Sequence, residues 1–181
     1  DQLQARICSM RKWDPSADFP DYSDDAITHS IKNWGIPYFG EIRRKEDLKR
    51  LDFEQMLKQS LSWEMQQILD ERLPEKIEVP SGSLIRVRYD QEGNTPVLAV
   101  RLQELFGLKE SPTLDRGRRN VILHLLSPGY KPVQVTQDLR NFWEKTYHEV
   151  RKELKIRYPK HAWPEDPWSA QAVRGVPRKK T

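Results

Sequence analysis

The chain has 181 residues, of which 36% are hydrophobic and 32% charged, and a formal net charge of +4. This composition supports one or two small hydrophobic cores. No apolar run approaches the roughly 20 residues that a membrane span requires, and no signal peptide is visible near the start. A single cysteine, Cys8, excludes an internal disulfide framework and a multi-cysteine zinc site. We therefore expect a cytoplasmic protein with no membrane insertion.

Charge and apolar spacing both change near Pro74. Residues 1–75 hold 11 Lys or Arg against 15 Asp or Glu, whereas residues 76–181 hold 20 against 12. The apolar spacing changes there from helical to alternating, and Leu73-Pro74 ends the last helical pattern. The chain also starts at Asp1, without a methionine, inside a helical pattern, so we expect it to be a piece of a longer polypeptide.

The first half has the spacing of short helices. Ser23, Asp52 and Ser62 precede three of the patterns, where a side-chain oxygen can accept hydrogen bonds from the free amides of a helix. We expect five helices, with the apolar residues Leu3, Ile7 and Met10; Ile27, Ile31 and Trp34; Leu48 and Leu51; Phe53, Met56 and Leu57; and Trp63, Ile68 and Leu69.

The second half combines hairpins and helices. Alternation predicts one hairpin over 77–89, with Arg86 and Arg88 on a wet, basic face, and a second over 121–135. Residues 96–107 have helical spacing after a proline, and Asp138 caps a long helix with the apolar stripe Leu139, Phe142, Trp143, Tyr147, Val150 and Leu154.

These elements predict an α+β fold. We expect a helical subdomain at 1–74, a small antiparallel sheet with two flanking helices at 75–168, and a basic, flexible tail at 169–181. An oligonucleotide-binding barrel is a second possibility for the sheet, but only four convincing strands are visible where that fold uses five.

The sequence shows no motif for a catalytic, nucleotide-binding or metal-binding site. The eight glycines are scattered and none precedes a lysine, so no phosphate-binding loop is present. The four histidines are isolated, and no two lie at i, i+4 on one predicted helix, so we interpret them as structural rather than as metal ligands. No nucleophile elbow is present. We therefore expect no catalytic residue, no metal site and no cofactor in this chain.

Cationic residues are the remaining candidates for function. The last predicted helix and the residues after it carry Arg140, Lys145, Arg151, Lys152, Lys155, Arg157 and Lys160, interleaved with Glu144, Glu149 and Glu153 at pairing distance. Such a face can bind phosphates, or it can be an ordinary salt-bridged helix surface. No acidic neighbours are visible for the arginines at 86, 88, 116, 118 and 119 or for the cations of the tail. The predicted nucleic-acid contacts are Arg86, Arg88, Arg118, Arg119, Arg151, Lys155 and Arg157.

An aromatic segment follows the last predicted helix. Tyr158, His161, Trp163 and Trp168 lie among prolines 159, 164 and 167. These rings can stack on bases, as in single-strand binding proteins. We favour the alternative, in which the prolines hold an extended strap and the tryptophans anchor it on the domain by apolar burial.

Four motifs recur in an order that resembles a known family. They are PSGS, VLAVRLQELFGL, LLSPGYKPVQVTQDLRNFW and RYPKHAWPEDP, and LSWEMQQILDERLP precedes them. Together they resemble the carboxy-terminal region of bacterial HrpB-type DExH-box ATP-dependent helicases. The resemblance implies a parent enzyme with two motor domains that hold ATP and Mg²⁺ upstream of this region, and it transfers no catalytic residue to this chain.

Two functions are compatible with these features. In the first, the chain is a non-catalytic accessory domain of a helicase that holds RNA or DNA beside the motor through basic surfaces. In the second, it is a protein-interaction module that docks on the helicase core or recruits another protein, with the aromatic strap and the acidic helical half as contact surfaces. An independent enzyme is the least supported reading, because no reactive constellation is present.

Overall fold

The computed structural model describes residues 1–40 and 42–176. They form two compact units, Asp1–Leu73 with Tyr89–Asn94, and Pro74–Arg88 with the chain from Thr95 onward. The subdivision at 1–74, 75–168 and 169–181 stays a prediction, and residues 177–181 of the predicted tail lie outside the described residues. Within the described ranges, every helix is too short or too polar to traverse a lipid bilayer.

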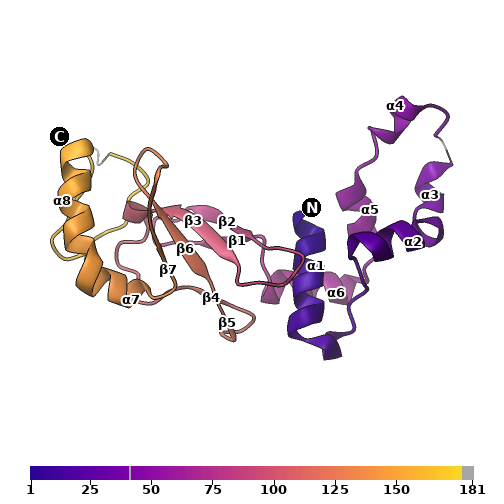
Figure 1. Ribbon diagram of the computed structural model, residues 1–181, viewed down its shortest axis with the longest axis horizontal. Helices are drawn as coiled ribbons and strands as arrows, with labels where there is room; N and C mark the ends of the chain where they lie inside the picture. Colours follow the sequence, from indigo (N-terminus) through magenta and orange to yellow (C-terminus); the bar gives the residue numbers. More distant parts are fainter. Residues whose placement is uncertain (41, 177–181) are drawn as a thin grey trace. The chain divides into compact units, whose positions relative to one another are not determined.

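The first unit is built from short helices (Figure 1). Ser23, Asp52 and Ser62 accept hydrogen bonds from backbone amides at 3.3, 3.0 and 3.2 Å, which confirms the three predicted caps. The third predicted helix, with Leu48 and Leu51, is observed but ends at Leu48, so Leu51 lies outside it, and one short helix begins at Ile36 where none was expected. The helices are α1 (Gln2–Trp13), α2 (Asp24–Trp34), α3 (Ile36–Phe39), α4 (Lys45–Leu48), α5 (Phe53–Gln59) and α6 (Trp63–Arg72), with a 3₁₀ turn, η1 (Pro15–Ala17), after α1.

An arginine is buried in the core of this first unit. Arg6 on α1 is 2% exposed. Its Nε donates to the carbonyl oxygen of Leu73 at 2.7 Å, and its terminal nitrogen lies 2.6 Å from the carboxylate of Asp70. A buried guanidinium is tolerated only where such partners replace water. Arg6 therefore ties α1 to the end of α6.

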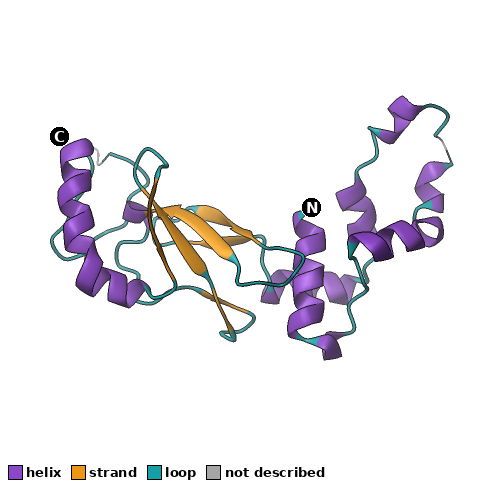
Figure 2. Ribbon diagram, in the orientation of Figure 1, coloured by secondary structure: helices purple, strands orange, loops and turns teal. Residues whose placement is uncertain are grey.

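The second unit is organised around a five-stranded sheet (Figure 2). The strand order is β1-β2-β3-β6-β7, in which β3 and β6 are parallel and the other neighbours antiparallel. A separate small hairpin joins β4 to β5. The strands are β1 (Lys76–Glu78), β2 (Leu84–Arg88), β3 (Val97–Arg101), β4 (Thr113–Leu114), β5 (Arg119–Asn120), β6 (Ile122–Leu126) and β7 (Pro132–Thr136). Both predicted hairpins are confirmed, as β1–β2 and β6–β7.

The helix predicted over residues 96–107 is wrong. Residues 97–101 form the central strand β3, followed by a 3₁₀ turn, η2 (Leu102–Glu104). Leu98 and Val100 are 0% and 1% exposed and alternate with half-buried neighbours, so this short segment satisfies a period of two as well as a helical period. Pairing with β6 decides between the two, and it makes the sheet mixed rather than purely antiparallel.

The predicted C-terminal helix is confirmed, with an internal irregularity. It comprises α7 (Leu139–Asn141), a π-helical segment η3 (Phe142–Thr146) and α8 (Tyr147–Arg157), and the Asp138 carboxylate accepts from the amide of Asn141 at 2.9 Å. The rings of Phe106, Phe142, Trp143 and Tyr147 form five pairs with centroids 5.2 to 6.4 Å apart. All four side chains are at most 2% exposed. This cluster is the centre of the core of the second unit.

Candidate nucleic-acid interface

The arginines of β2 lie on an accessible face of the sheet. Arg86 and Arg88 are exposed, while Val87 between them is 1% exposed. Alternation along a strand places the two guanidinium groups on one face and Val87 on the other. Lys76 of β1 lies directly across from Arg86, which adds a third cation that the sequence did not single out. This is the solvent-exposed, basic face that the alternation of apolar and charged residues predicted.

Arg118, near the β4–β5 turn, has an acidic neighbour, whereas none was expected from the sequence for the arginines at 116, 118 and 119. Arg118 donates to the carboxylate of Asp115 at 3.0 Å, and Asp115 is only 3% exposed. Asp115 and Arg116 adopt positive φ values of 52° and 56°, so the turn folds back and brings residues 115 and 118 together. Asp115 lies three residues before Arg118, but no helix was predicted there, so this pair was not expected. Arg119 lies in β5 and is half-buried.

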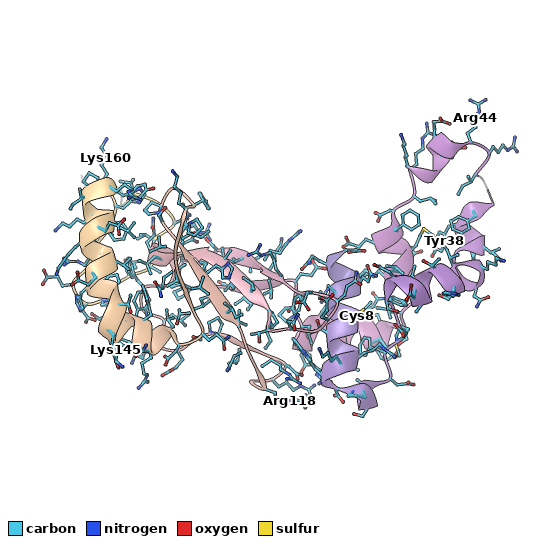
Figure 3. The ribbon with its side chains drawn as sticks, viewed as in Figure 1. Cys8, Tyr38, Arg44, Arg118, Lys145 and Lys160 are labelled. Atoms are coloured by element: carbon cyan, nitrogen blue, oxygen red, sulfur yellow. The ribbon has the colours of Figure 1, made fainter. Side chains whose placement is uncertain are left out.

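The cations of α8 fall into paired and unpaired groups. Arg157 lies 3.2 Å from Glu153 and Lys152 lies 2.9 Å from Glu149, so the salt-bridged interpretation holds for these two. Lys155 is exposed and forms no ion pair with another described residue. Figure 3 shows Lys145 near the start of this helical segment and Lys160 beyond its end, both with side chains directed outward.

Arg151 is a structural residue as much as a surface cation. Its side chain is 17% exposed, its Nε donates to the carbonyl oxygen of Trp163 at 2.8 Å, and its terminal nitrogen lies 3.4 Å from Glu165. Both partners belong to the segment after α8. Arg151 therefore holds that segment against the helix, and its hydrogen bonds leave fewer donors for a phosphate.

The aromatic segment after α8 is tied to the second unit. Trp163 is 8% exposed and its Nε1 donates to the carbonyl oxygen of Tyr158 at 2.8 Å. The Tyr158 hydroxyl lies 3.3 Å from the Ser127 hydroxyl, and the rings of Tyr158 and His161 form an edge-on pair with centroids 6.0 Å apart. Trp168 is half-buried. The buried indole of Trp163 agrees with docking rather than with base stacking.

A polar cluster lies beside this segment at the end of β3. Arg101 pairs with Glu104 at 2.8 Å, and the guanidinium carbon of Arg101 lies 4.9 Å from the ring centroid of Tyr130. Burial raises the pKa of the Glu104 carboxyl, but hydrogen bonds from Ser83, Arg101 and Ser81 outweigh it, so that the pKa is lowered overall. The sequence missed Arg101 because it fell inside the wrongly predicted helix.

His161 is held in its neutral form by the same cluster. Desolvation, followed by the positive charge of Arg101, lowers the pKa of His161 from its ordinary value of 6.5. Its Nδ1 lies 3.1 Å from the side-chain nitrogen of Gln103, which is fully buried. A neutral, tethered imidazole contributes no charge to phosphate binding near pH 7. Among the described residues, no group of three or more His, Cys, Asp or Glu side chains is placed to hold a metal ion.

The predicted cations therefore do not form one continuous site. Arg86 and Arg88 lie together on β2, Arg118 and Arg119 lie at the β4–β5 hairpin, and Arg151, Lys155 and Arg157 lie on α8. Arg118, Arg151 and Arg157 already have carboxylate partners, which reduces their value as phosphate ligands. The β2 pair has none among the described residues. Nucleic-acid binding by all seven stays a prediction.

Comparison with known proteins identifies the family. Residues 34–167 match the family model described as ATP-dependent helicase C-terminal, HrpB_C. The chain belongs to the HrpB C-terminal family. The match begins within the helical half and ends in the aromatic segment, so it includes the β2 arginines, the β4–β5 hairpin and α8.

A relative and two crystal structures agree with this assignment. The ATP-dependent RNA helicase HrpB of Escherichia coli K12 is 44% identical over 96% of this chain, which spans 21% of that protein. A crystal structure of the E. coli DExH-box NTPase HrpB matches with a TM-score of 0.88 at 44% identity, over 96% of this chain and 21% of the other. A crystal structure of the E. coli DEAH/RHA helicase HrpB gives a TM-score of 0.73 at 43% identity, over 90% and 20%.

Proposed function

We propose that this chain is a non-catalytic accessory domain of an ATP-dependent helicase and that it contacts RNA or DNA through basic surfaces of its second unit. The observation that carries the proposal is the family match over residues 34–167, together with a relative that is named an ATP-dependent RNA helicase. In this proposal the helicase core is the domain's partner in the same polypeptide, ATP and Mg²⁺ bind to that core, and the protein works in the cytoplasm.

Charge supports the nucleic-acid part of the proposal. The residues from 76 onward carry 20 Lys or Arg against 12 Asp or Glu. Cations that neutralise phosphates release condensed counterions, so the logarithm of the association constant falls linearly with the logarithm of the salt concentration. Contacts of this kind position a strand without reading its sequence. An accessory domain beside a motor needs this property, because the motor must move along any sequence.

A salt titration tests the contact. Fluorescence anisotropy of labelled single- and double-stranded RNA is measured with the 181-residue chain between about 50 and 200 mM salt. We expect binding that weakens steeply with salt for at least one RNA. No binding to either RNA at 50 mM would contradict the nucleic-acid contact. ATP hydrolysis by this chain, free of contaminating ATPase, would contradict its non-catalytic role.

A protein-interaction module is the second candidate, and exposed apolar side chains favour it. In the first unit, Ile36, Phe53 and Trp63 are 64%, 45% and 69% exposed. Large apolar and aromatic side chains are common anchors at protein interfaces. The test is a pull-down with separately expressed motor domains of the parent helicase. Association that is lost on replacing Trp63 with alanine would support this candidate, and no association in trans would count against it.

A further inference from the structure

The five-stranded sheet has two unlike faces. One face carries Val87, Leu98, Val100, Leu123 and Leu125, all at most 1% exposed. These residues pair across the strands, since Val87 lies opposite Leu98, Leu98 opposite Leu123, and Val100 opposite Leu125. The core of the second unit covers this face. Side chains at the alternate positions point to the opposite face.

The opposite face has three cross-strand rows, and the row at the end of β3 joins Arg101 to Leu126 and Leu126 to Pro132. In one row, Arg88 lies opposite Val97, which lies opposite Ile122. In the next row, Ala99 lies opposite His124, which lies opposite Val135. Arg86 is two residues before Arg88 on β2 and faces the same way. Over the rows of Val97 and Ala99, the face is therefore apolar across β3 and β6 and cationic along β2.

This face is accessible. Val97, Ala99, Ile122 and His124 are only half-buried although they lie on the two central strands, and Val135 is 57% exposed. A covered sheet face would bury central-strand side chains as fully as those of the other face. We define these five residues as the apolar strip.

The cations beside the strip are unpaired, unlike those of the β4–β5 turn and most of α8. Arg86, Arg88 and Lys76 are exposed, and none of their side chains has a hydrogen bond or ion pair with another described residue. At the end of this face, Arg101 is neutralised by Glu104, which is 3% exposed, and the exposed carboxylate of Glu78 lies across from Leu84. Outside that ion pair, three exposed cations, Lys76, Arg86 and Arg88, against the one carboxylate of Glu78 make the rim of the strip electropositive.

We propose that the apolar strip and its arginine rim bind single-stranded nucleic acid, with phosphates on Arg86 and Arg88 and bases against the strip around His124. This inference rests on the nucleic-acid contact proposed above and names its surface and substrate class. Side chains two apart on a strand are separated by about 6.6 Å, so the two arginines can serve two successive phosphates of one strand. Bases have flat faces that can stack on the His124 ring, as bases stack on rings in single-strand binding proteins, and that can pack on the aliphatic residues beside it without reading sequence.

A double helix fits this face less well than a single strand. The bases of a duplex are stacked inside it and present only their edges, so a half-buried apolar strip would gain nothing from them. An acidic peptide would satisfy the arginines, but carboxylates have no flat apolar faces to cover Val97, Ala99 and Ile122. Single-stranded nucleic acid satisfies both the charge and the apolar surface.

The test is the double variant Arg86→Gln, Arg88→Gln, bound to a fluorescein-labelled oligouridine of about 12 nucleotides. Two lost phosphate contacts reduce the salt slope for a single strand by about 1.4. At a fourfold lower salt concentration, the ratio of variant to wild-type Kd should therefore rise by about sevenfold. The control is Lys109→Gln, Lys145→Gln, which removes the same charge from exposed positions outside the strip and its rim. Its slope should stay within a few tenths of the wild-type value.

A second variant tests the strip itself. Ala99→Glu places a carboxylate beside His124, where it repels phosphates and covers the apolar surface. We expect at least tenfold weaker oligouridine binding at 50 mM salt, with urea unfolding checked for an intact fold. Amide chemical shifts on adding oligouridine should change in β2, β3 and β6 more than in α8.

The outcomes separate this inference from the proposed function. Wild-type chain that binds no RNA refutes the nucleic-acid contact and this inference together. Wild-type binding with equal slopes for the arginine variant and its control refutes the sheet face alone. Oligouridine that a polyglutamate peptide displaces as well as unlabelled oligouridine does would refute nucleic acid as the occupant of this face.

Discussion

Replacement of Trp163 by alanine should destabilise the second unit without abolishing RNA binding. Trp163 is 8% exposed, its Nε1 donates to the Tyr158 carbonyl at 2.8 Å, and its own carbonyl accepts from Arg151 at 2.8 Å. The variant removes the indole and the first hydrogen bond, and keeps the backbone carbonyl that Arg151 uses. It therefore isolates the anchoring role of the ring.

The expected loss follows from the buried area. A tryptophan side chain removes roughly 200 Å² from water on burial, which corresponds to an upper estimate of about 5 kcal/mol. Core substitutions of this kind cost about 3 to 5 kcal/mol. Trp163 lies in an extended segment that can relax around the missing ring, unlike the four-ring cluster of the core. We therefore expect a loss near the lower end, about 3 kcal/mol.

Native-state hydrogen exchange of the β3 and β6 amides measures this loss, because these central strands report unfolding of the second unit. Ile156→Ala is the matched control, since Ile156 is 84% exposed on the neighbouring helix and its loss should change stability by less than about 0.5 kcal/mol. A loss below about 1 kcal/mol for Trp163→Ala, combined with at least tenfold weaker oligouridine binding, would refute the docking role and restore base stacking.

Three further predictions concern side-chain contacts of Tyr147, His161 and Arg118. Tyr147→Phe removes the hydroxyl that donates to the Pro164 carbonyl at 2.8 Å, and should cost about 1 to 2 kcal/mol in urea unfolding; an unchanged midpoint would contradict this anchor. The lowered pKa of His161 means that the unfolded chain binds the proton more readily, so the free energy of unfolding should fall as pH drops from about 6.5 through the lowered pKa. His161→Gln should flatten that part of the curve, and an equally steep curve would assign it to other groups. Arg118→Ala should reduce stability by about 1 kcal/mol because the carboxylate of Asp115, 3% exposed, loses an ion-pair partner, whereas Arg118→Lys should retain most of it; equal losses for both would contradict the ion pair.

The helical half was predictable because its signals are local. Caps at Ser23, Asp52 and Ser62 depend on side chains that reach amides three residues away, and the sequence displays both partners. Hairpins are equally local, since the turn and both strands are contiguous in the chain. These elements need no knowledge of the rest of the fold.

The central strand β3 was not predictable from its own residues. Leu98, Leu102 and Leu105 fit a helix, and Val97 to Arg101 fit a strand. The pairing that decides between them brings β3 beside β6, 25 residues away in register, with Leu98 opposite Leu123. A parallel pair joins segments that are distant in the chain, so no turn signal marks it. The error in the helix also hid Arg101.

Counting cations in the sequence overstates the charge that is available to a ligand. Arg118 is paired through a turn with positive φ values, and Arg151 is engaged by a segment that returns after α8. Asp115 lies three residues before Arg118, but in a turn and not in a helix, and Glu165 lies 14 residues after Arg151. The exposure and the ion pairs of these side chains are known only from the fold. They make Arg86 and Arg88 the strongest candidates for phosphate contacts.

Paired and unpaired arginines differ in what they gain from binding a phosphate, because a paired arginine already has a counter-charge. When a phosphate binds to Arg157, the carboxylate of Glu153 must give way or stay close to the phosphate and repel it, so little counterion release is gained. Arg86 and Arg88 have solution ions as their partners, and a phosphate can replace those ions at no electrostatic cost. The salt slope of RNA binding should therefore depend on β2 more than on α8, although α8 carries more cations.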